Sequence, residues 1–229
     1  MTPYYADDLV TLWLGDCRTV TEWLAADVLV TDPPYGRGAA GIHHDNGTVG
    51  RQYVSAVGRR VDGPIAGDDD TVVRDDALRL WGDRPAAVFA DLRIPVPGSM
   101  QVAVYRKPPD AGARSTAGFR RDAEAIHLLN LPAGYGGRSS IITTGARSQG
   151  NPSACAARYQ HPHAKPVDVM ETLIEACPVG TIADPFAGSG STLVAARNLG
   201  RKAIGVEVDE RYAERAARRL SQMTLLVAQ

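Results

Sequence analysis

The chain alternates between short apolar runs and amphipathic segments, and this alternation predicts an open α/β sheet. Apolar, β-prone runs bounded by polar or turn residues predict strands at 9–16, 27–32, 86–90, 101–105, 123–131, 181–184 and 202–208. Helical spacing predicts helices at 20–24, 71–80, 167–177, 191–199 and 210–220. The first strand, helix and strand form a βαβ unit, which predicts parallel strands with a right-handed crossover. We therefore expect an α/β fold with a mostly parallel, doubly wound sheet, in a single domain over residues 1–229.

Two long stretches interrupt this alternation. Residues 36–70 show no hydrophobic periodicity and contain eight glycines, so we expect a long mobile loop there. Residues 132–165 are rich in glycine, proline and serine and are strongly cationic. Loops of such length are usually functional or disordered, so both are candidates for contact with a ligand.

Composition narrows the class of protein. The 229 residues are 44% hydrophobic and 22% charged, as in ordinary globular domains. Apolar runs are too short for a membrane span, and the first residues lack the pattern of a signal peptide. The three cysteines are far apart and never form C-x-x-C, which disfavours a disulfide framework or a cysteine zinc site. The expectation is a soluble cytoplasmic protein.

The formal net charge of −1 conceals an uneven distribution along the chain. Residues 1–92 hold 8 Lys/Arg and 15 Asp/Glu, residues 93–165 hold 10 and 3, and residues 166–229 hold 7 and 8. The cationic middle third is consistent with one positive face for a polyanion. It is equally consistent with solvated loops whose arginines pair with the acidic first segment.

A glycine-rich turn joins the strand at 181–184 to the following helix. In Asp184-Pro185-Phe186-Ala187-Gly188-Ser189-Gly190 the glycines allow a tight turn, and the helix begins with unsatisfied amides that attract an anionic or carboxylate-bearing group. Glu207 ends the next strand, where a nucleotide-binding α/β fold places an acid that binds ribose hydroxyls. Leu193 stands where the dinucleotide fingerprint has its third glycine, which argues against a nicotinamide or flavin cofactor.

A second candidate site is Asp32-Pro33-Pro34-Tyr35, directly after an apolar strand. The consecutive prolines restrict the backbone and remove amide donors. The Asp32 carboxylate and the Pro33 carbonyl could then accept the two hydrogens of an exocyclic amino group, while Tyr35 stacks on the ring. Alternatively, the segment is a rigid turn that ends a strand and packs a tyrosine.

The two motifs together resemble the amino methyltransferases of DNA, which use S-adenosylmethionine to methylate N6 of adenine or N4 of cytosine. Here the D-P-P-Y motif precedes the F-x-G-x-G motif, as in the permuted group usually called the β class. Further matching segments are 14–17, His161-Pro162-His163-Ala164-Lys165-Pro166 and 204–209. The resemblance covers nearly all of residues 9–220. It implies a Rossmann-like methyltransferase domain with circularly permuted motif order and long loops at the DNA face.

The resemblance also implies roles for individual residues. Phe186, Gly188 and Gly190 would wrap the methionine part of the cofactor, with Asp184 supporting its ammonium group. Its carboxylate would be held by Ser191, Thr192 or Lys165. Glu207 would bind the ribose hydroxyls, and Asp16 would lie near the adenine amino group. The acceptor site would consist of Asp32, Pro33, Pro34 and Tyr35.

Double-stranded DNA is the partner that the resemblance implies. The phosphate contacts expected in the cationic region are Arg106, Lys107, Arg114, Arg120, Arg121, Arg138, Arg147 and Arg158. Bases would be read by the loop at 36–70 or by 132–160, the latter within the basic region 132–165 as a minimal recognition element. The absence of a large recognition domain favours a short target sequence or a homodimer, and any restriction endonuclease would be a separate chain.

Several alternatives stay open. By the same resemblance, Asp32 favours N6 of adenine as the methylated atom, and N4 of cytosine is the nearest alternative. A non-catalytic nucleic-acid-binding module or a degenerate methyltransferase subunit is the alternative of another class. No metal is expected, because His161 and His163 have one intervening proline and no nearby cysteine or carboxylate partner. A cytoplasmic chain of bacterial or phage origin fits this interpretation.

Overall fold

The computed structural model describes residues 2–36, 67–108, 118–119, 121–132, 137–144 and 164–227, with side chains of the last helix as far as Gln222. Most of the predicted loop at 36–70 and of the basic region 132–165 therefore lies outside the described residues.

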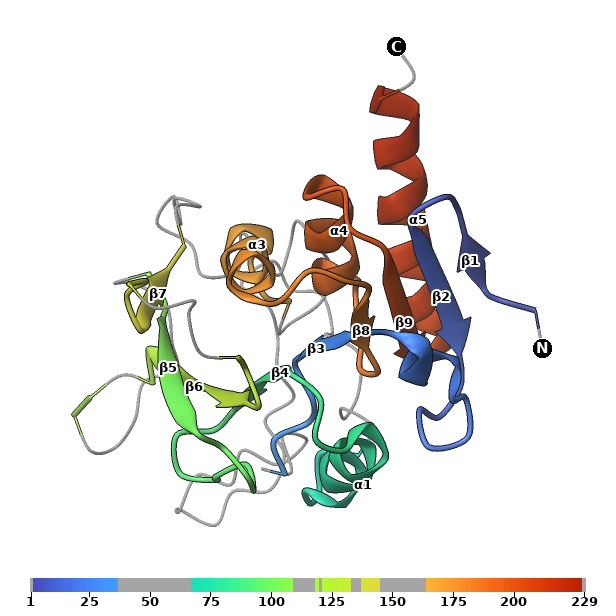
Figure 1. The fold of residues 1–229 in the computed structure, drawn as a ribbon. Helices are drawn as coiled ribbons and strands as arrows, with labels where there is room; N and C mark the ends of the chain where they lie inside the picture. Colours follow the sequence, from blue (N-terminus) through green and yellow to red (C-terminus); the bar gives the residue numbers. More distant parts are fainter. Residues whose placement is uncertain are drawn as a thin grey trace.

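The described residues form a sheet of nine strands in the order β1-β2-β9-β8-β3-β4-β6-β5-β7 (Figure 1). In chain order these are β1 Tyr5–Ala6, β2 Val10–Leu14, β3 Val28–Thr31, β4 Ala86–Ala90, β5 Gln101–Arg106, β6 Ala123–Leu129, β7 Ile141–Thr143, β8 Ile182–Asp184 and β9 Ala203–Glu207. The expected α/β class with a mostly parallel sheet is confirmed.

Five central strands run parallel, so their carboxyl ends share one edge of the sheet. They are β2, β9, β8, β3 and β4. Strand β6 is antiparallel to both β4 and β5, so β6 begins at this edge while β5 ends there. The predicted βαβ unit is modified, because β2 and β3 are parallel but have β9 and β8 between them.

Helices cover both faces of the sheet (Figure 1). The helices α3 Val167–Ala176, α4 Ser191–Asn198 and α5 Glu210–Val227 pack on the face that carries Val28 and Val30. The helix α1 Val72–Trp81 and the 3-10 helix η1 Glu22–Ala25 pack on the opposite face with Leu29. This alternation follows from the period of two in a strand that is buried on both sides.

Three elements differ from the prediction, and each is short. The helix expected at 20–24 is the four-residue 3-10 helix η1, which is fixed by Trp23: its indole Nε1 donates to the Cys17 carbonyl at 2.9 Å. Strands β1 and β7 were not predicted, because two or three residues carry no readable periodicity. Strand β7 lies inside the predicted loop 132–165 and pairs with the edge of β5.

Close packing fixes the glycine turn against the sheet. Gly190 begins α4 with a φ of +80°, and a Cβ added there would lie 3.0 Å from the Cβ of Ala216 on α5. A Cβ on Gly205 of β9 would lie 2.8 Å from a methyl group of Leu193 on α4. Glycine at both positions therefore lets α4 approach α5 and β9 closely.

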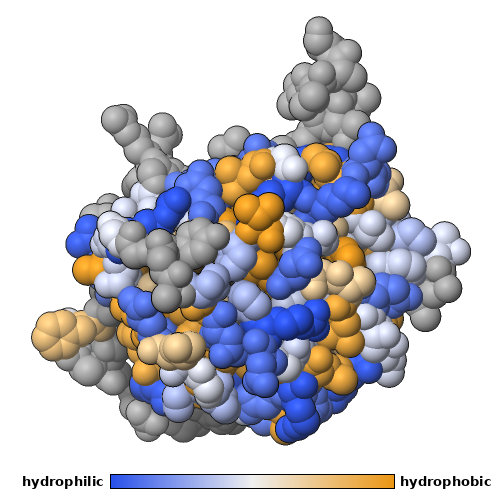
Figure 2. Space-filling model, viewed as in Figure 1, coloured by the Kyte–Doolittle hydropathy of each residue, from blue (hydrophilic) through white to orange (hydrophobic). Residues whose placement is uncertain are grey.

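The surface in the view of Figure 1 is a mosaic. Among its coloured residues, hydrophilic groups alternate with small hydrophobic groups and no single large apolar patch dominates (Figure 2). Within the described ranges, no helix combines the length and the apolar character needed to cross a bilayer.

Candidate active site

The two predicted motifs meet at the carboxyl edge of the sheet. Strands β3 and β8 are parallel neighbours, with Leu29 opposite Ala183. At their ends the Thr31 hydroxyl donates a hydrogen bond of 2.7 Å to Oδ1 of Asp184. The turn after β3 and the turn after β8 are thus joined directly, although 153 sequence positions separate the two bonded residues.

The turn after β3 holds Asp32 by both of its carboxylate oxygens. The Tyr35 hydroxyl donates to Oδ1 at 2.8 Å, and the Lys165 ammonium contacts Oδ2 at 2.6 Å. Oδ1 of the buried Asp68 accepts the backbone amides of Tyr35 at 2.8 Å and of Gly36 at 3.0 Å. Asp68 thereby fixes the backbone that follows the two prolines.

Lys165 is buried beside aromatic rings and acids. Its Nζ lies 5.0 Å from the ring centroid of Phe89 and 5.4 Å from that of Tyr35. It also lies 3.3 Å from Oε2 of Glu124. Burial acts to lower the pKa of Lys165, but the two carboxylates Asp32 and Glu124 outweigh burial and raise it. Lys165 is therefore a charged partner of Asp32 in this structure, and its predicted contact with the cofactor carboxylate stays a prediction.

The glycine turn carries a buried carboxylate. Asp184 accepts bonds from Thr31 and from the Phe186 amide at 3.2 Å, and Thr192 also bonds its side chain. Burial nevertheless raises the pKa of Asp184 to about 7, because desolvation outweighs these hydrogen bonds. Ser191 and Thr192 are buried in the first turn of α4, where the backbone amides of the helix start converge.

Glu207 spans from β9 to the glycine turn. Its Oε2 accepts the Gly188 amide at 2.7 Å, and its Oε1 accepts the Asp209 amide at 2.8 Å. Burial raises the pKa of Glu207 despite these two bonds. Within the described part of the chain, no lysine or arginine pairs with Glu207 or Asp184, so each carboxylate is held by neutral donors.

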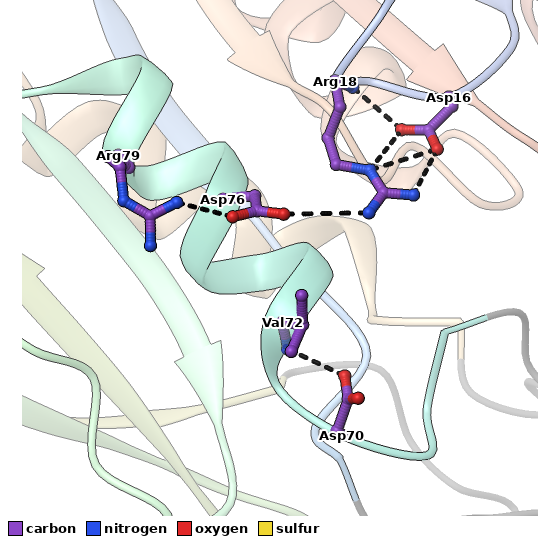
Figure 3. A network of polar contacts seen from close by, with 6 residues as sticks. All are labelled: Asp16, Arg18, Asp70, Val72, Asp76 and Arg79. Atoms are coloured by element: carbon purple, nitrogen blue, oxygen red, sulfur yellow. Dashed lines mark hydrogen bonds and ion pairs between the residues drawn. The ribbon is translucent and has the colours of Figure 1, made fainter.

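Asp16 belongs to a polar network on the side of α1 (Figure 3). The Arg18 guanidinium bonds both carboxylate oxygens of Asp16, with 2.6 Å between Nη2 and Oδ2. Its Nη1 lies 3.7 Å from Oδ2 of Asp76 on α1. Hydrogen bonding to Arg18 lowers the pKa of Asp16. Asp76 also bonds Arg79 at 2.5 Å, so this network attaches the turn after β2 to α1.

The cationic residues proposed for DNA do not share one environment. Arg106 and Arg121 are exposed, whereas Lys107 pairs with Glu124 at 2.6 Å and Arg138 pairs with Glu175 at 3.3 Å. The remaining four lie outside the described residues: Arg114, Arg120, Arg147 and Arg158. All eight phosphate contacts therefore stay predictions.

Three residues of the site were missed in the sequence, namely Thr31, Asp68 and Glu124. Glu124 had one usable signal, since it is the only acidic residue in the apolar run 123–131. Asp68 belongs to a run of three aspartates, which is typical of a solvated loop. Among described residues, no three His, Cys, Asp or Glu side chains form a group that could hold a metal ion, and His161 and His163 lie outside them.

Comparison with known proteins identifies the family. The model of a DNA methylase family, the N6/N4 methyltransferases, matches residues 78–218. The chain belongs to this DNA methylase family. It is 31% identical over 221 residues to YubD of Escherichia coli (strain K12), whose name calls it a methylase, covering 90% of this chain and 88% of that protein.

Other relatives of this DNA methylase match over shorter segments. The type II methyltransferase M.ScaI of Streptomyces caespitosus is 40% identical over 81 residues, which cover 34% of this chain and 25% of that protein. The type II methyltransferase M2.DpnII of Streptococcus pneumoniae is 41% identical over 63 residues, 27% of this chain and 24% of that protein.

Solved structures share the fold at low sequence identity. The structure of the M1.HpyAVI–SAM complex superimposes with a TM-score of 0.60 at 17% identity, and the match covers 93% of this chain and 99% of that chain. PvuII DNA methyltransferase, described as cytosine-N4-specific, gives 0.59 at 13% identity and covers 94% and 87%. The Rossmann-like methyltransferase fold is thereby confirmed, while the assignment to the permuted group stays a prediction.

Proposed function

We propose that this DNA methylase transfers a methyl group from S-adenosylmethionine to the exocyclic N6 of an adenine that has left the duplex. Family membership supports the class of reaction. The observation that carries the proposal is the hydrogen bond of 2.7 Å between Thr31 and Asp184. It joins the turn proposed to hold the acceptor to the turn proposed to hold the donor.

The charges of the glycine turn fit S-adenosylmethionine. Asp184 and Glu207 are buried carboxylates whose pKa values are raised because burial is not offset by a cation among the described residues. A ligand that brings an ammonium group and a sulfonium centre would supply positive charge near Asp184, and its ribose hydroxyls would bond Glu207. The residues proposed to hold the cofactor are Asp16, Lys165, Asp184, Phe186, Gly188, Gly190, Ser191, Thr192 and Glu207.

The turn after β3 fits a neutral amino group. Asp32 already has Lys165 and Tyr35 as partners, but each carboxylate oxygen can accept a second bond. Asp32 and the Pro33 carbonyl would accept the two amino hydrogens and favour a pyramidal nitrogen with its lone pair toward the donor. Bound S-adenosylmethionine supplies an electrophilic methyl group. Transfer would then be direct: the N–CH₃ bond forms as the S–CH₃ bond breaks, S-adenosylhomocysteine leaves as the neutral thioether, and one amino hydrogen is lost as a proton to solvent. Positioning with preorganised electrostatics would supply most of the acceleration.

Extruding the base from the duplex requires free energy that other contacts of the protein with DNA must supply. Taking a base out of the stack costs a few kcal/mol, and stacking on Tyr35 returns roughly 1–3 kcal/mol. Phosphate contacts by the exposed Arg106 and Arg121 would contribute to the remainder. A homodimer and a separate restriction endonuclease stay predictions from the sequence.

N4 of cytosine is the second candidate acceptor, because the fold is shared with PvuII DNA methyltransferase, described as cytosine-N4-specific. The two amino groups present the same hydrogens to Asp32 and Pro33. Asp32 rather than serine at the start of the motif favours adenine, which rests on the family resemblance.

Nucleoside analysis tests the proposal. The purified protein is incubated with S-adenosylmethionine carrying a deuterated methyl group and with genome-length DNA free of adenine and cytosine methylation. Digestion and mass spectrometry are expected to detect labelled N6-methyladenine, and the same amount of Asp32→Asn is expected to yield at least about a hundredfold less in the same time. Labelled N4-methylcytosine would overturn the adenine assignment. A protein that binds the cofactor but labels no nucleoside would overturn the function.

A further inference from the structure

A chain of alternating charges ends at Asp32. The Lys107 ammonium, directly after β5, lies 2.6 Å from Oε1 of Glu124 on β6. Oε2 of Glu124 lies 3.3 Å from Nζ of Lys165, which in turn lies 2.6 Å from Oδ2 of Asp32. We refer to Lys107, Glu124, Lys165 and Asp32 as the charge chain. It connects the turn after β3, the end of β5, the start of β6 and the residue before α3's N-cap.

The inner members of the charge chain are withdrawn from water. The side chain of Lys165 is 8% exposed and that of Glu124 is 14% exposed. Burial alone raises the pKa of Glu124, but Lys165 and Lys107 outweigh it and hold this pKa at about 2. Charges in such surroundings are costly unless each has an opposite neighbour, and here positive and negative groups alternate with a net charge of zero.

The rigid part of the charge chain is Glu124. It is the second residue of β6, at the edge of the sheet where β6 begins, and it lies opposite Tyr105 of β5. The strand itself pairs with β4 on one side and with β5 on the other. Lys165, in contrast, precedes α3 and lies outside any strand or helix. An acid anchored in the sheet can therefore determine where the Lys165 ammonium lies relative to Asp32.

We infer that Glu124, supported by Lys107, is a positioning residue that acts through Lys165 to orient the Asp32 carboxylate. This inference rests on the proposed function, in which Asp32 accepts the amino hydrogens. Lys165 on Oδ2 and the Tyr35 hydroxyl on Oδ1 fix the plane of the carboxylate at two points. The unused lone pairs then point in a defined direction before the base arrives, which is the preorganisation that accelerates transfer.

Loss of the Glu124 charge leaves Lys165 with Asp32 as its only carboxylate partner in the charge chain. The ammonium is then free to shift toward Asp32 or to turn away from it, and the carboxylate loses its fixed plane. Such a change affects the geometry of transfer more than the binding of either substrate. Misplacement by about 1 Å at a reacting centre costs on the order of a hundredfold in rate.

A double-mutant cycle tests the inference in the full-length protein. Single-turnover methyl transfer at saturating cofactor and DNA is measured for Glu124→Gln, Lys165→Met and the double variant. Glu124→Gln is expected to slow transfer about tenfold to a hundredfold, while the dissociation constant of S-adenosylmethionine changes by less than about threefold. In the Lys165→Met background, Glu124→Gln is expected to have no further effect, because it acts through that ammonium. Equal fractional losses in both backgrounds would overturn the inference.

Two further variants separate positioning from folding. Glu214→Gln makes the same substitution in the exposed ion pair with Arg218 on α5, and it is expected to transfer at the wild-type rate. If Glu124→Gln does not fold, the same rate is measured for Lys107→Met, because the Lys107 side chain is more exposed than that of Glu124. A slower single-turnover rate at saturating DNA, with unchanged cofactor affinity, supports the inference, and the wild-type rate contradicts it.

Failure of the inference is distinguishable from failure of the proposed function. If Asp32→Asn slows transfer at least about a hundredfold while folded Glu124→Gln transfers at the wild-type rate, only the positioning role is wrong. If the wild-type protein binds S-adenosylmethionine but labels no DNA base, the proposed function is wrong.

Discussion

The two halves of the site bury carboxylates in opposite ways. On the side of β8 and β9, Asp184 and Glu207 are bonded by amides and hydroxyls, and burial raises both pKa values, that of Asp184 to about 7. On the side of β5 and β6, Glu124 is also buried, yet Lys165 and Lys107 hold its pKa at about 2. The direction of the shift thus depends on the counterion and not on burial alone.

This difference predicts the charge of the ligand on each side. Asp184, which has no cationic partner among the described residues, suits a positively charged group such as the ammonium of S-adenosylmethionine, and Glu207, which is bonded by neutral amides, suits the ribose hydroxyls. The charge chain is already neutral, so the neighbouring acceptor site suits an uncharged amino group. We expect variants beside β8 and β9 to weaken cofactor binding, and variants in the charge chain to slow methyl transfer.

Asp32→Asn is expected to have the largest effect and to act on transfer alone. Asparagine keeps the size of the side chain, but it has one acceptor oxygen and turns an NH₂ donor toward Lys165 or Tyr35. The single-turnover rate should fall on the order of 10²- to 10³-fold, the loss typical of a preorganised electrostatic group. Calorimetric titration should give nearly the wild-type affinity for S-adenosylmethionine.

Glu207→Gln is the matched variant on the opposite side. It loses one of the two acceptors that bind the Gly188 and Asp209 amides, so cofactor affinity should weaken about tenfold. Transfer at saturating cofactor should remain close to wild type. The comparison fails if both variants lose affinity and rate in the same proportion.

The affinity for the cofactor is also expected to depend on pH. Because a cation binds the carboxylate form, Asp184 must lose its proton, and its pKa is about 7 in the free protein. Affinity should therefore fall as the pH is lowered through 7 and be about 30-fold weaker at pH 5.5 than at pH 8. The raised pKa of Glu207 acts in the same direction.

Asp184→Asn provides the reference for this titration. The variant should show a flatter profile, in which any remaining slope comes from the ligand and from Glu207. A wild-type profile parallel to that of Asp184→Asn would show that Asp184 does not titrate on binding. Unfolding gives an independent check, because folded Asp184 keeps a proton that the unfolded chain releases near pH 3.8. Without cofactor, the free energy of unfolding should therefore decrease as the pH rises from about 4 to about 7.

Gly205→Ala is expected to have the smallest effect, and it acts on the packing beneath the glycine turn. The new methyl group would lie 2.8 Å from Leu193 and 3.2 Å from Ala187, so the structure must shift. We expect the free energy of unfolding to fall by about 1–3 kcal/mol, measured by urea denaturation. Adding Leu193→Val should recover part of the loss, and strictly additive losses would contradict a direct clash.

Much of the fold could be predicted from the sequence, because the central strands are apolar runs bounded by polar or turn residues. Both turns were also predicted, since each motif is continuous in the sequence. The charge chain could not be predicted, because Lys165 and Asp32 are 133 residues apart and charged side chains give no signal of their partner. The edge strands β1 and β7 were missed because pairing with a neighbour, and not their own pattern, makes them strands.

A crystal structure with a non-reactive amino analogue of S-adenosylmethionine tests the central claim most directly. We expect the ribose of the analogue at Glu207, its amino-acid end at the turn from Asp184 to Gly190, and the atom that replaces the methyl-bearing sulfur facing Asp32. An analogue bound away from the carboxyl edge of β8 and β9, or with that atom directed away from Asp32, would contradict the claim.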